Sequence, residues 1–547
     1  MNARTAVADS WGTRRAEARL DRLAYGIVIL FTAFVLFFGW KFHWMESAGG
    51  PENDGYVAKA EALQRGEIPA DPFRPLLYPL LAAGAGAVLD DTFAGARLIS
   101  QLAAGWLALL TYWLGRRCFG RAVGVLALLG VVTNYTVVSA GVYAATDMLF
   151  AAFTVWVLLL LCREDAHWPR RSVVVLGMAF ALAYFTRYTA IALIPSVIVA
   201  LTWGRPLLNR ATAYRLSLFA AAAALFLVPH FVLTTEALGH PFYNENWKNL
   251  AFKLYGGGDW EYYERIPYDG LLATILAGPG RVIGSALEEA VRFFTLLPVV
   301  SGNFRWWTPT GILVLAAFLL GSVGSLAALD RKKAVLLTFI LVYVSMVSVF
   351  YAWRSRLLLP VLPVVFILAG YAIRDVLMPW IRTIWPGRAG WVLPLLGVVL
   401  LASQSGPLVW KLRQFVRDHP AAEVAAAREL EFLYGKEVRV LSTFRLLPRY
   451  VGYPTFFLRD AVGEEVRDKE RYYAKLLATV ERLRPDYLVV GRVTLSRRPT
   501  NLLFADDVPP PLQLVSQSAD VAVYRVQLEA PAPEQMLRAA PATGQVR

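Results

Sequence analysis

Long apolar runs separated by short polar gaps make up the first 410 residues of the chain. The runs at 23–40, 123–138 and 357–373 approach the length of about 20 residues that an α-helix needs to cross the hydrocarbon core of a membrane. The strict alternation of apolar and polar residues that is typical of a membrane β-barrel is not seen. The pattern therefore predicts a polytopic α-helical membrane protein.

We expect about eleven membrane spans from this pattern. They are placed at 23–42, 94–115, 122–139, 148–162, 172–186, 189–203, 214–233, 309–329, 334–352, 357–378 and 389–408. Two long segments between them, 43–93 and 234–308, are too polar to span and are predicted to be loops. Within the second loop, residues 281–298 are predicted to form a helix along the membrane interface.

Basic residues are concentrated in every second gap, which is the pattern of cytoplasmic loops in membrane proteins. These clusters fall at 14–22, 116–121, 163–171, 205–215, 331–333 and 374–388. The N-terminus is therefore predicted to be cytoplasmic, with both long loops and the C-terminal segment on the outer side. The first apolar run follows a basic segment as in a signal peptide, but no small-residue cleavage site follows it, which favours a retained span.

The composition supports a helical membrane protein and argues against a soluble or nucleic-acid-binding protein. Hydrophobic residues make up 57% of the chain and charged residues 18%, whereas soluble domains have about 45–50% and about 25%. The net charge of +14 comes from the predicted cytoplasmic loops and forms no basic face with interleaved aromatic residues, which excludes nucleic-acid binding. Cys118 and Cys162 fall at predicted cytoplasmic ends of spans, where packed thiols are expected rather than a disulfide or a zinc site.

The composition becomes that of a soluble domain after residue 410. Short buried strands are predicted at 438–441, 455–458 and 487–490, with a helix at 469–483 and a hairpin at 512–526. We expect residues 411–530 to form a small extracytoplasmic α/β domain beside a transmembrane domain of residues 1–410. The Pro- and Ala-rich tail, 531–547, is expected to be disordered.

Asp54 is the most informative polar residue of the first loop. It lies a few residues beyond the first span, at the start of a predicted helix. As an N-cap, it would accept hydrogen bonds from backbone N–H groups. As a carboxylate at the membrane surface, it could also take a proton from an acceptor hydroxyl. The two roles are compatible.

Arginines at the predicted outer ends of spans are candidates for binding phosphate, because a guanidinium binds phosphate in a bidentate manner. These residues are Arg74, Arg187, Arg354 and Arg356. The alternative for each arginine alone is an anchor that extends to the lipid headgroups.

A series of short motifs occurs in a characteristic order along the chain. They are Asp54, 61–66, Leu77-Tyr78-Pro79, Ala96-Arg97-Leu98-Ile99-Ser100, 114–120, Asp147-Met148-Leu149-Phe150 and 354–360. This order resembles the polyprenyl-phosphate-dependent glycosyltransferases of the C-type membrane fold. It is most similar to glycosyltransferase family 39, which holds the protein O-mannosyltransferases and the aminoarabinose transferases. The usual Asp-Glu pair is Asp54-Gly55 here, so a role for a second adjacent carboxylate does not carry over.

The resemblance implies a hexosyl- or pentosyl-type glycosyltransferase of the bacterial inner membrane. Its donor would be a polyprenyl-phosphate-linked sugar, and its acceptor a protein, lipid or glycan on the outer side. The resemblance implies that Asp54 is the general base. It also implies that Asp147 orients the acceptor or binds a divalent metal, although a plain helix N-cap explains Asp147 equally well.

Further polar residues of the outer loops are candidates for binding substrate. Tyr56 and Tyr78 belong to the motifs of the first loop, and Glu236 and Tyr243 follow the seventh span. Glu236 and His240 could also contribute to a metal site, but a scattered Glu and His are more often part of an ordinary polar loop.

Two other functions compete with sugar transfer. A transporter or lipid flippase would place ionisable residues or broken helices near the middle of the bilayer. Here the predicted spans have few charges inside, and the polar residues gather at the outer ends. A structural assembly subunit would give no reason for Asp54, Asp147 and the arginines to share one side of the membrane.

Overall fold

The computed structural model describes residues 3–41, 55–163, 168–204, 206, 209–256, 262, 265–303, 307–385, 389–417, 421–435, 437–443, 447, 451, 454–458, 469–491, 508, 510–518 and 521–528. The chain divides into two compact units, one formed by 1–43 with 51–413 and the other by 44–50 with 414–547. Asp54 and the tail at 531–547 lie outside the described residues.

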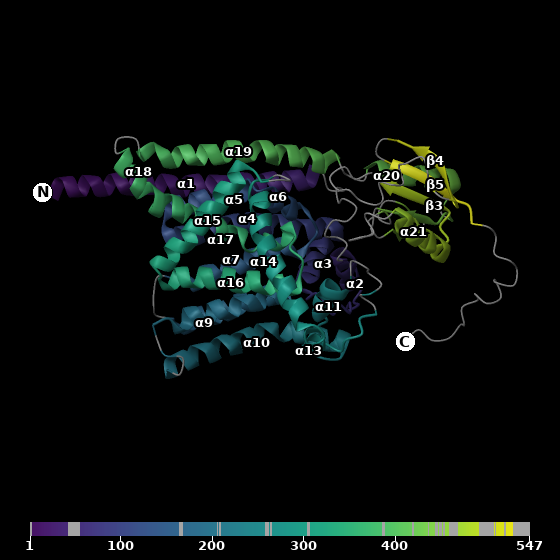
Figure 1. Ribbon diagram of the computed structural model, residues 1–547, viewed down its shortest axis with the longest axis horizontal. Coiled ribbons are helices and arrows are strands. Elements are labelled where there is room, and N and C mark those ends of the chain that lie inside the picture. Colours follow the sequence, from purple (N-terminus) through teal and green to yellow (C-terminus); the bar gives the residue numbers. More distant parts are fainter. Residues whose placement is uncertain are drawn as a thin grey trace. The chain divides into compact units, whose positions relative to one another are not determined.

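The larger unit is a bundle of helices that run side by side (Figure 1). Among the described residues, six helical segments are long and apolar enough to cross a membrane. They lie within α1 (Ala3–Lys41), α4 (Thr92–Phe119), α10 (Arg210–Leu238), α15 (Pro309–Ala327), α16 (Arg331–Phe350) and the continuous segment α17 (Leu362–Tyr371), η4 (Ala372–Leu377) and α18 (Met378–Ile384). The predicted class of a multi-pass helical membrane protein is confirmed.

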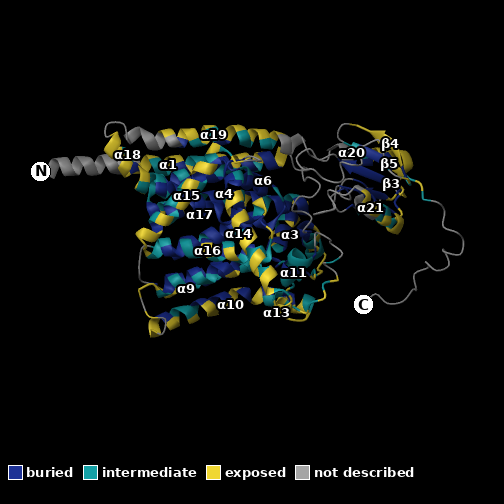
Figure 2. Ribbon diagram, in the orientation of Figure 1, coloured by how far each residue is buried: buried dark blue, intermediate teal, exposed yellow. Residues whose placement is uncertain are grey.

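The distribution of exposed apolar residues agrees with a membrane location. Figure 2 shows that α4 is largely buried, whereas α10 has a broad exposed face. Leu225 and Val232 of α10 are 67% and 55% exposed. Exposed apolar surface of this extent is unusual in a soluble monomer and is what a lipid-facing helix requires.

Several predicted spans are shorter or broken in the structure. The span predicted at 122–139 is a pair of helices, α5 (Arg121–Val132) and α6 (Tyr135–Val142), bent by 62°. The next three predicted spans correspond to α7 (Thr146–Leu161), α8 (Arg170–Thr186) and the combination of η2 (Tyr188–Leu193) with α9 (Ile194–Thr202). The last predicted span lies in α19 (Ala389–Arg417). The described helices thus provide six candidate spans, or seven with the bent pair, and the total of about eleven stays a prediction.

Two asparagines stabilise the break between α5 and α6. The Asn134 carboxamide accepts from the Thr136 N–H (3.0 Å) and donates to the Val300 carbonyl oxygen (2.8 Å). The Asn303 carboxamide accepts from the Tyr135 N–H (2.7 Å) and donates to the Thr133 carbonyl oxygen (2.6 Å). A broken helix is tolerated at membrane depth where its freed backbone groups find such partners.

Short helices form the two predicted outer loops. The first loop contains α2 (Tyr56–Gln64) and α3 (Leu77–Leu89), and the second contains α11 (Trp247–Tyr255), α13 (Leu271–Leu276) and α14 (Pro279–Ser301). Figure 1 shows α2, α3, α11 and α13 at the same end of the bundle. The Glu245 N–H donates to the Pro72 carbonyl oxygen (2.8 Å), and the Asn246 side chain donates to the Phe73 carbonyl oxygen (3.2 Å). The two loops therefore contact each other. The helix predicted at 281–298 is present as part of α14, which packs against α15 and α16.

The smaller unit contains a five-stranded sheet in the order β2-β1-β3-β5-β4. Its strands are β1 (Val440–Ser442), β2 (Thr455–Phe457), β3 (Tyr487–Gly491), β4 (Leu512–Gln517) and β5 (Val521–Val526), and its helices are α20 (Ala421–Tyr434) and α21 (Lys469–Leu483). The first three strands are parallel, and the hairpin β4–β5 pairs antiparallel with β3. Every predicted strand, the hairpin and the helix at 469–483 are present.

Burial explains why these short strands could be predicted. All residues of β3 are buried, as expected for a central strand covered on both faces. Leu476 and Val480 of α21 pack against Leu488 and Val490 of β3 in the core of this unit.

Candidate active site

A buried ion pair lies between α7 and the end of α8. Asp147 is in the first turn of α7, and its side chain is only 4% exposed. Arg187 follows α8 in an extended conformation, and its guanidinium donates to the Asp147 carboxylate. The same guanidinium lies over the Phe150 ring, 5.9 Å from its centroid. A buried carboxylate is stable only if it is paired, so the fold depends on this contact.

Electrostatic interactions connect this pair to a group of tyrosines. Burial acts to lower the pKa of the Arg187 guanidinium. Asp147 and the phenols of Tyr56, Tyr343 and Tyr351 act to raise it, and the net result is a raised pKa. Arg187 therefore remains positively charged at every physiological pH.

Three of the predicted phosphate-binding arginines act electrostatically on Tyr351. Burial raises the pKa of its phenol, and the positive charges of Arg187, Arg74 and Arg356 act against that rise. Its hydroxyl donates to the Asn246 carboxamide oxygen (3.2 Å), which belongs to the second loop. The charges of Arg74, Arg187 and Arg356, which are distant from one another in the sequence, therefore all act on this one phenol. Arg354 is exposed.

The site also contains Asp71 and Lys59, which were not among the site residues predicted from the sequence. The Asp71 side chain is 4% exposed, forms an ion pair with Lys59 and lies 3.6 Å from the Arg74 guanidinium. Its other oxygen accepts from the N–H groups of Phe73 (2.8 Å) and Arg74 (3.1 Å). An Asp that bonds to the backbone just after it is a common turn device. The Asp71-Pro72 dipeptide is the signal that could have indicated this turn.

The tyrosines of the first loop are buried and hydrogen-bonded to protein groups. The Tyr56 hydroxyl lies 3.1 Å from the Thr146 hydroxyl, next to Asp147. The Tyr78 hydroxyl donates to the Ala96 carbonyl oxygen (2.7 Å) and lies 2.9 Å from the Ser100 hydroxyl. The two rings meet edge to face at 5.5 Å. Tyr78 thus joins α3 to α4, whereas Tyr56 joins the first loop to the start of α7.

Two predicted substrate-binding residues are not part of the group of charged side chains formed by Asp71, Arg74, Asp147 and Arg187 (the charged cluster). Glu236 is exposed near the end of α10. Tyr243 is 42% exposed, and its hydroxyl donates to the Glu245 carboxylate (2.8 Å) rather than to any group around Asp147. Within the described part of the chain, no group of three or more His, Cys, Asp or Glu side chains has an arrangement that could hold a metal ion. Cys118 and Cys162 are free thiols.

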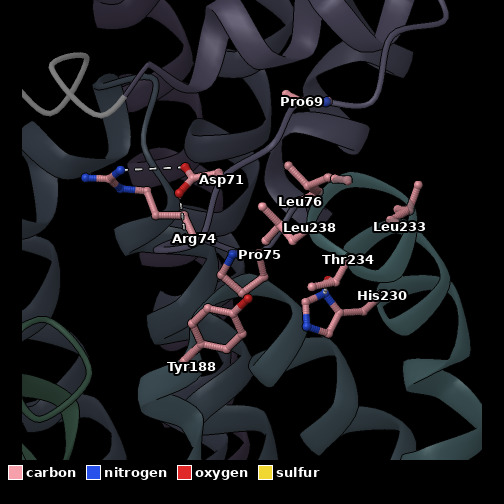
Figure 3. A pocket seen from close by; sticks show the side chains of 11 residues that line it. Pro69, Asp71, Arg74, Pro75, Leu76, Tyr188, His230, Leu233, Thr234 and Leu238 are labelled. Carbon is pink, nitrogen blue, oxygen red and sulfur yellow. Dashed lines mark hydrogen bonds and ion pairs between the residues drawn. The ribbon is translucent and has the colours of Figure 1, made fainter. Parts of the chain in front are cut away.

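A narrow pocket adjoins the Asp71 turn. Figure 3 shows Asp71, Arg74, Tyr188, His230 and Thr234 around it. The Thr234 hydroxyl lies 3.3 Å from Nδ1 of His230, and the His230 ring packs against those of Tyr184 and Tyr188. The pocket is therefore lined by polar groups of the first loop, η2 and α10 among apolar residues of the first loop and α10.

The fold of the chain is similar to that of solved structures whose bound ligands include lipid phosphates. ArnT from Cupriavidus metallidurans bound to undecaprenyl phosphate matches with a TM-score of 0.57 and 15% identity, over 91% of this chain and 98% of ArnT. Archaeal oligosaccharyltransferase AglB from Archaeoglobus fulgidus, in complex with an inhibitory peptide and a dolichol-phosphate, matches with a TM-score of 0.51 and 11% identity, over 86% of this chain and 69% of AglB.

A family model matches part of the chain by sequence. Residues 73–232 match the family model described as dolichyl-phosphate-mannose-protein mannosyltransferase. The matched region contains Arg74, Asp147 and Arg187. The resemblance to glycosyltransferase family 39 is thereby confirmed over this region. No curated protein matches the chain by sequence.

Proposed function

We propose that this protein is a glycosyltransferase that moves a sugar from a polyprenyl-phosphate donor to an acceptor on the outer side of the bacterial inner membrane. The observation that carries the proposal is that Asn246 of the second loop joins the Phe73 carbonyl oxygen, next to Arg74, to the Tyr351 hydroxyl, in the segment that leads to Arg356. Both outer loops thus meet the bundle here, where Asp71 and Asp147 form ion pairs with Arg74 and Arg187. Such a site suits the phosphate of a lipid at the membrane surface.

The paired carboxylates have a role in this proposal that differs from the sequence expectation. Asp71 contacts Arg74, and Asp147 contacts Arg187. Each acid therefore orients an arginine instead of binding the acceptor or a metal. A guanidinium held in place before the reaction stabilises developing charge without a cost of reorganisation.

The reaction then proceeds in one displacement. Asp54 takes the proton of the acceptor hydroxyl, whose oxygen forms a bond to the anomeric carbon of the sugar. The bond between that carbon and the donor phosphate oxygen breaks, and its electron pair stays on the phosphate. Arg74, Arg187 and Arg356, with Arg354 assisting, stabilise the released polyprenyl phosphate. Tyr56, whose hydroxyl lies next to that of Thr146, is proposed to contact the substrate.

The test of this function is transfer from labelled polyprenyl-phospho-sugars by the purified protein in lipid nanodiscs. A panel of hexose and pentose donors with protein, lipid and glycan acceptors would identify the substrates. Transfer of label to an acceptor supports the proposal. Movement of the lipid phosphate across the bilayer without cleavage of the sugar bond would instead identify a flippase.

Substitution of the arginines in segment 354–356 tests the phosphate site. We expect Arg356→Ala to lower kcat by about 10²–10³-fold, as for the loss of one preorganised donor at an oxyanion, with a smaller change in donor binding. Arg354→Ala is expected to have a smaller effect, because Arg354 is exposed. Arg65→Ala is the control, since Arg65 forms only an exposed ion pair with Glu67. Undiminished transfer by both Arg354→Ala and Arg356→Ala would remove this assignment.

The proposed orientation gives a separate prediction. Because basic clusters mark the cytoplasmic side, a phosphatase reporter fused after residue 411 is expected to be active in the periplasm. A fusion after residue 331, in a predicted cytoplasmic loop, is the control and should be inactive there. Reporter fusions beyond 411 that are active only in the cytoplasm would reverse the topology.

A further inference from the structure

The segment that carries Arg354 and Arg356 is not part of a long helix. It begins where α16 ends at Phe350, continues through extended residues and forms the short helix η3 (Ser355–Leu358). Such a segment has few backbone hydrogen bonds of its own to define its conformation. Contacts from other elements therefore help to hold it in place, such as the hydrogen bond from the Tyr343 hydroxyl of α16 to the Leu357 carbonyl oxygen (3.1 Å).

Glu289 of α14 makes the central contact. Its side chain is 7% exposed, although the neighbouring Glu288 is exposed. One carboxylate oxygen accepts from the Trp353 backbone N–H (2.7 Å), and the other lies 3.4 Å from Arg292. A buried carboxylate is retained only where it is well paired. Here its closest partner is the peptide N–H that directly precedes Arg354.

The Trp353 side chain is held by contacts with α14 and α16. It is 2% exposed, and its indole N–H donates to the Ser348 hydroxyl (3.0 Å). Its ring lies 5.1 Å from that of Phe293, one turn along α14 from Glu289. The backbone and the side chain of Trp353 are therefore both anchored to elements outside the arginine segment.

Lys253 of α11 provides a further contact, with the end of α16. Its ammonium group donates to the Ser348 carbonyl oxygen (2.6 Å) at the end of α16, where a positive charge is favourable. Burial lowers the pKa of this lysine, and the carboxylates of Glu289 and Glu288 act against that effect. Both α11 and α14 thus hold the end of α16 and the residue before Arg354.

We infer that Glu289 is a positioning residue that sets the placement of Arg354 and Arg356 by binding the Trp353 peptide N–H. The inference rests on the proposed function, in which these arginines stabilise the released phosphate. Without this acceptor, the Trp353 N–H would lose its partner in a buried position, and the segment would move to find another. An arginine displaced by about 1 Å can cost about 10²-fold in rate.

The experiment compares Glu289→Ala, Glu289→Gln and the matched control Glu288→Ala in full-length protein in nanodiscs. Glu289→Ala should lower kcat for sugar transfer by up to about 10²-fold, with a smaller change in KM for the donor. Glu289→Gln keeps a carbonyl oxygen for the Trp353 N–H and should restore most of kcat. Glu288→Ala should resemble the wild type, because the Glu288 side chain is exposed and Glu289, not Glu288, accepts from the Trp353 N–H. A purely structural role would lower the folded fraction without this split between kcat and KM.

A second measurement separates this inference from the proposed function. Hydrogen–deuterium exchange over 351–358 should be faster in Glu289→Ala than in Glu288→Ala, whether or not transfer is detected. Faster exchange in a protein that transfers no sugar would support the positioning role and overturn the proposed reaction. Equal kcat and equal exchange in Glu289→Ala and Glu288→Ala would overturn the inference.

Discussion

Substitution of Asp54 by asparagine is expected to lower sugar transfer by about 10²–10⁴-fold, the contribution that a general base typically makes. Asparagine keeps the shape of aspartate and much of its ability to cap a helix, but it does not accept the acceptor proton. The variant should therefore insert, fold and bind the donor lipid as the wild type does. Transfer of labelled sugar and binding of polyprenyl phosphate, measured on the same preparation, check this result.

The outcome of Asp54→Asn separates the roles that the sequence allows. Gly55 adopts a left-handed conformation (φ 70°) at the start of α2, so the chain turns directly after Asp54. Loss of folded protein would indicate that Asp54 mainly stabilises this turn. Transfer close to that of the wild type would remove Asp54 from the mechanism. Glu67→Gln is the control, because Glu67 is exposed in the same loop.

Arg187→Ala is expected to abolish transfer and also to destabilise the protein. The substitution would leave the Asp147 carboxylate, which is 4% exposed, without its ion-pair partner. Removal of one member of a buried ion pair typically costs about 3–5 kcal/mol. Denaturant unfolding in detergent should therefore show a lower midpoint. Arg171→Ala, at the exposed start of the same helix, should change neither property.

A double substitution distinguishes catalysis from stability at this pair. Asp147→Asn combined with Arg187→Gln removes both charges and leaves two side chains that can hydrogen-bond to each other. We expect it to recover much of the stability but none of the transfer, because the phosphate still lacks Arg187. Recovery of both properties would show that Arg187 has only a structural role.

The class of the protein and the small domain could be predicted because their signals are local. Apolar runs near the length of a span predict membrane helices without knowledge of the packing. Likewise, the strands at 440–442, 455–457 and 487–491 stand out as short apolar runs bounded by polar residues. The bend between α5 and α6 was not predicted, since its backbone partners include Val300 and Asn303, which are distant in sequence.

The candidate site was predicted only as a set of separate residues. The motif order indicated Asp54 and Asp147, and the predicted outer ends of the spans indicated the arginines, because both signals can be recognised along the sequence alone. It did not indicate that Asp147 pairs with Arg187, 40 positions away, or that Asp71 holds Arg74 in a turn. Glu236 and Tyr243 have suitable chemistry but are not brought to the charged cluster.

The sequence by itself determined that the chain is a helical membrane protein whose basic clusters fall in every second loop, followed by a small α/β domain. Hydrophobic length, charge placement and motif order are properties of neighbouring residues, so they need no folded structure to be observed. Only the tertiary structure decided which acids orient which arginines, and that Glu289 supports the segment before Arg354. These pairings arise because a buried charge requires a partner, and packing of distant helices decides which partner is within reach.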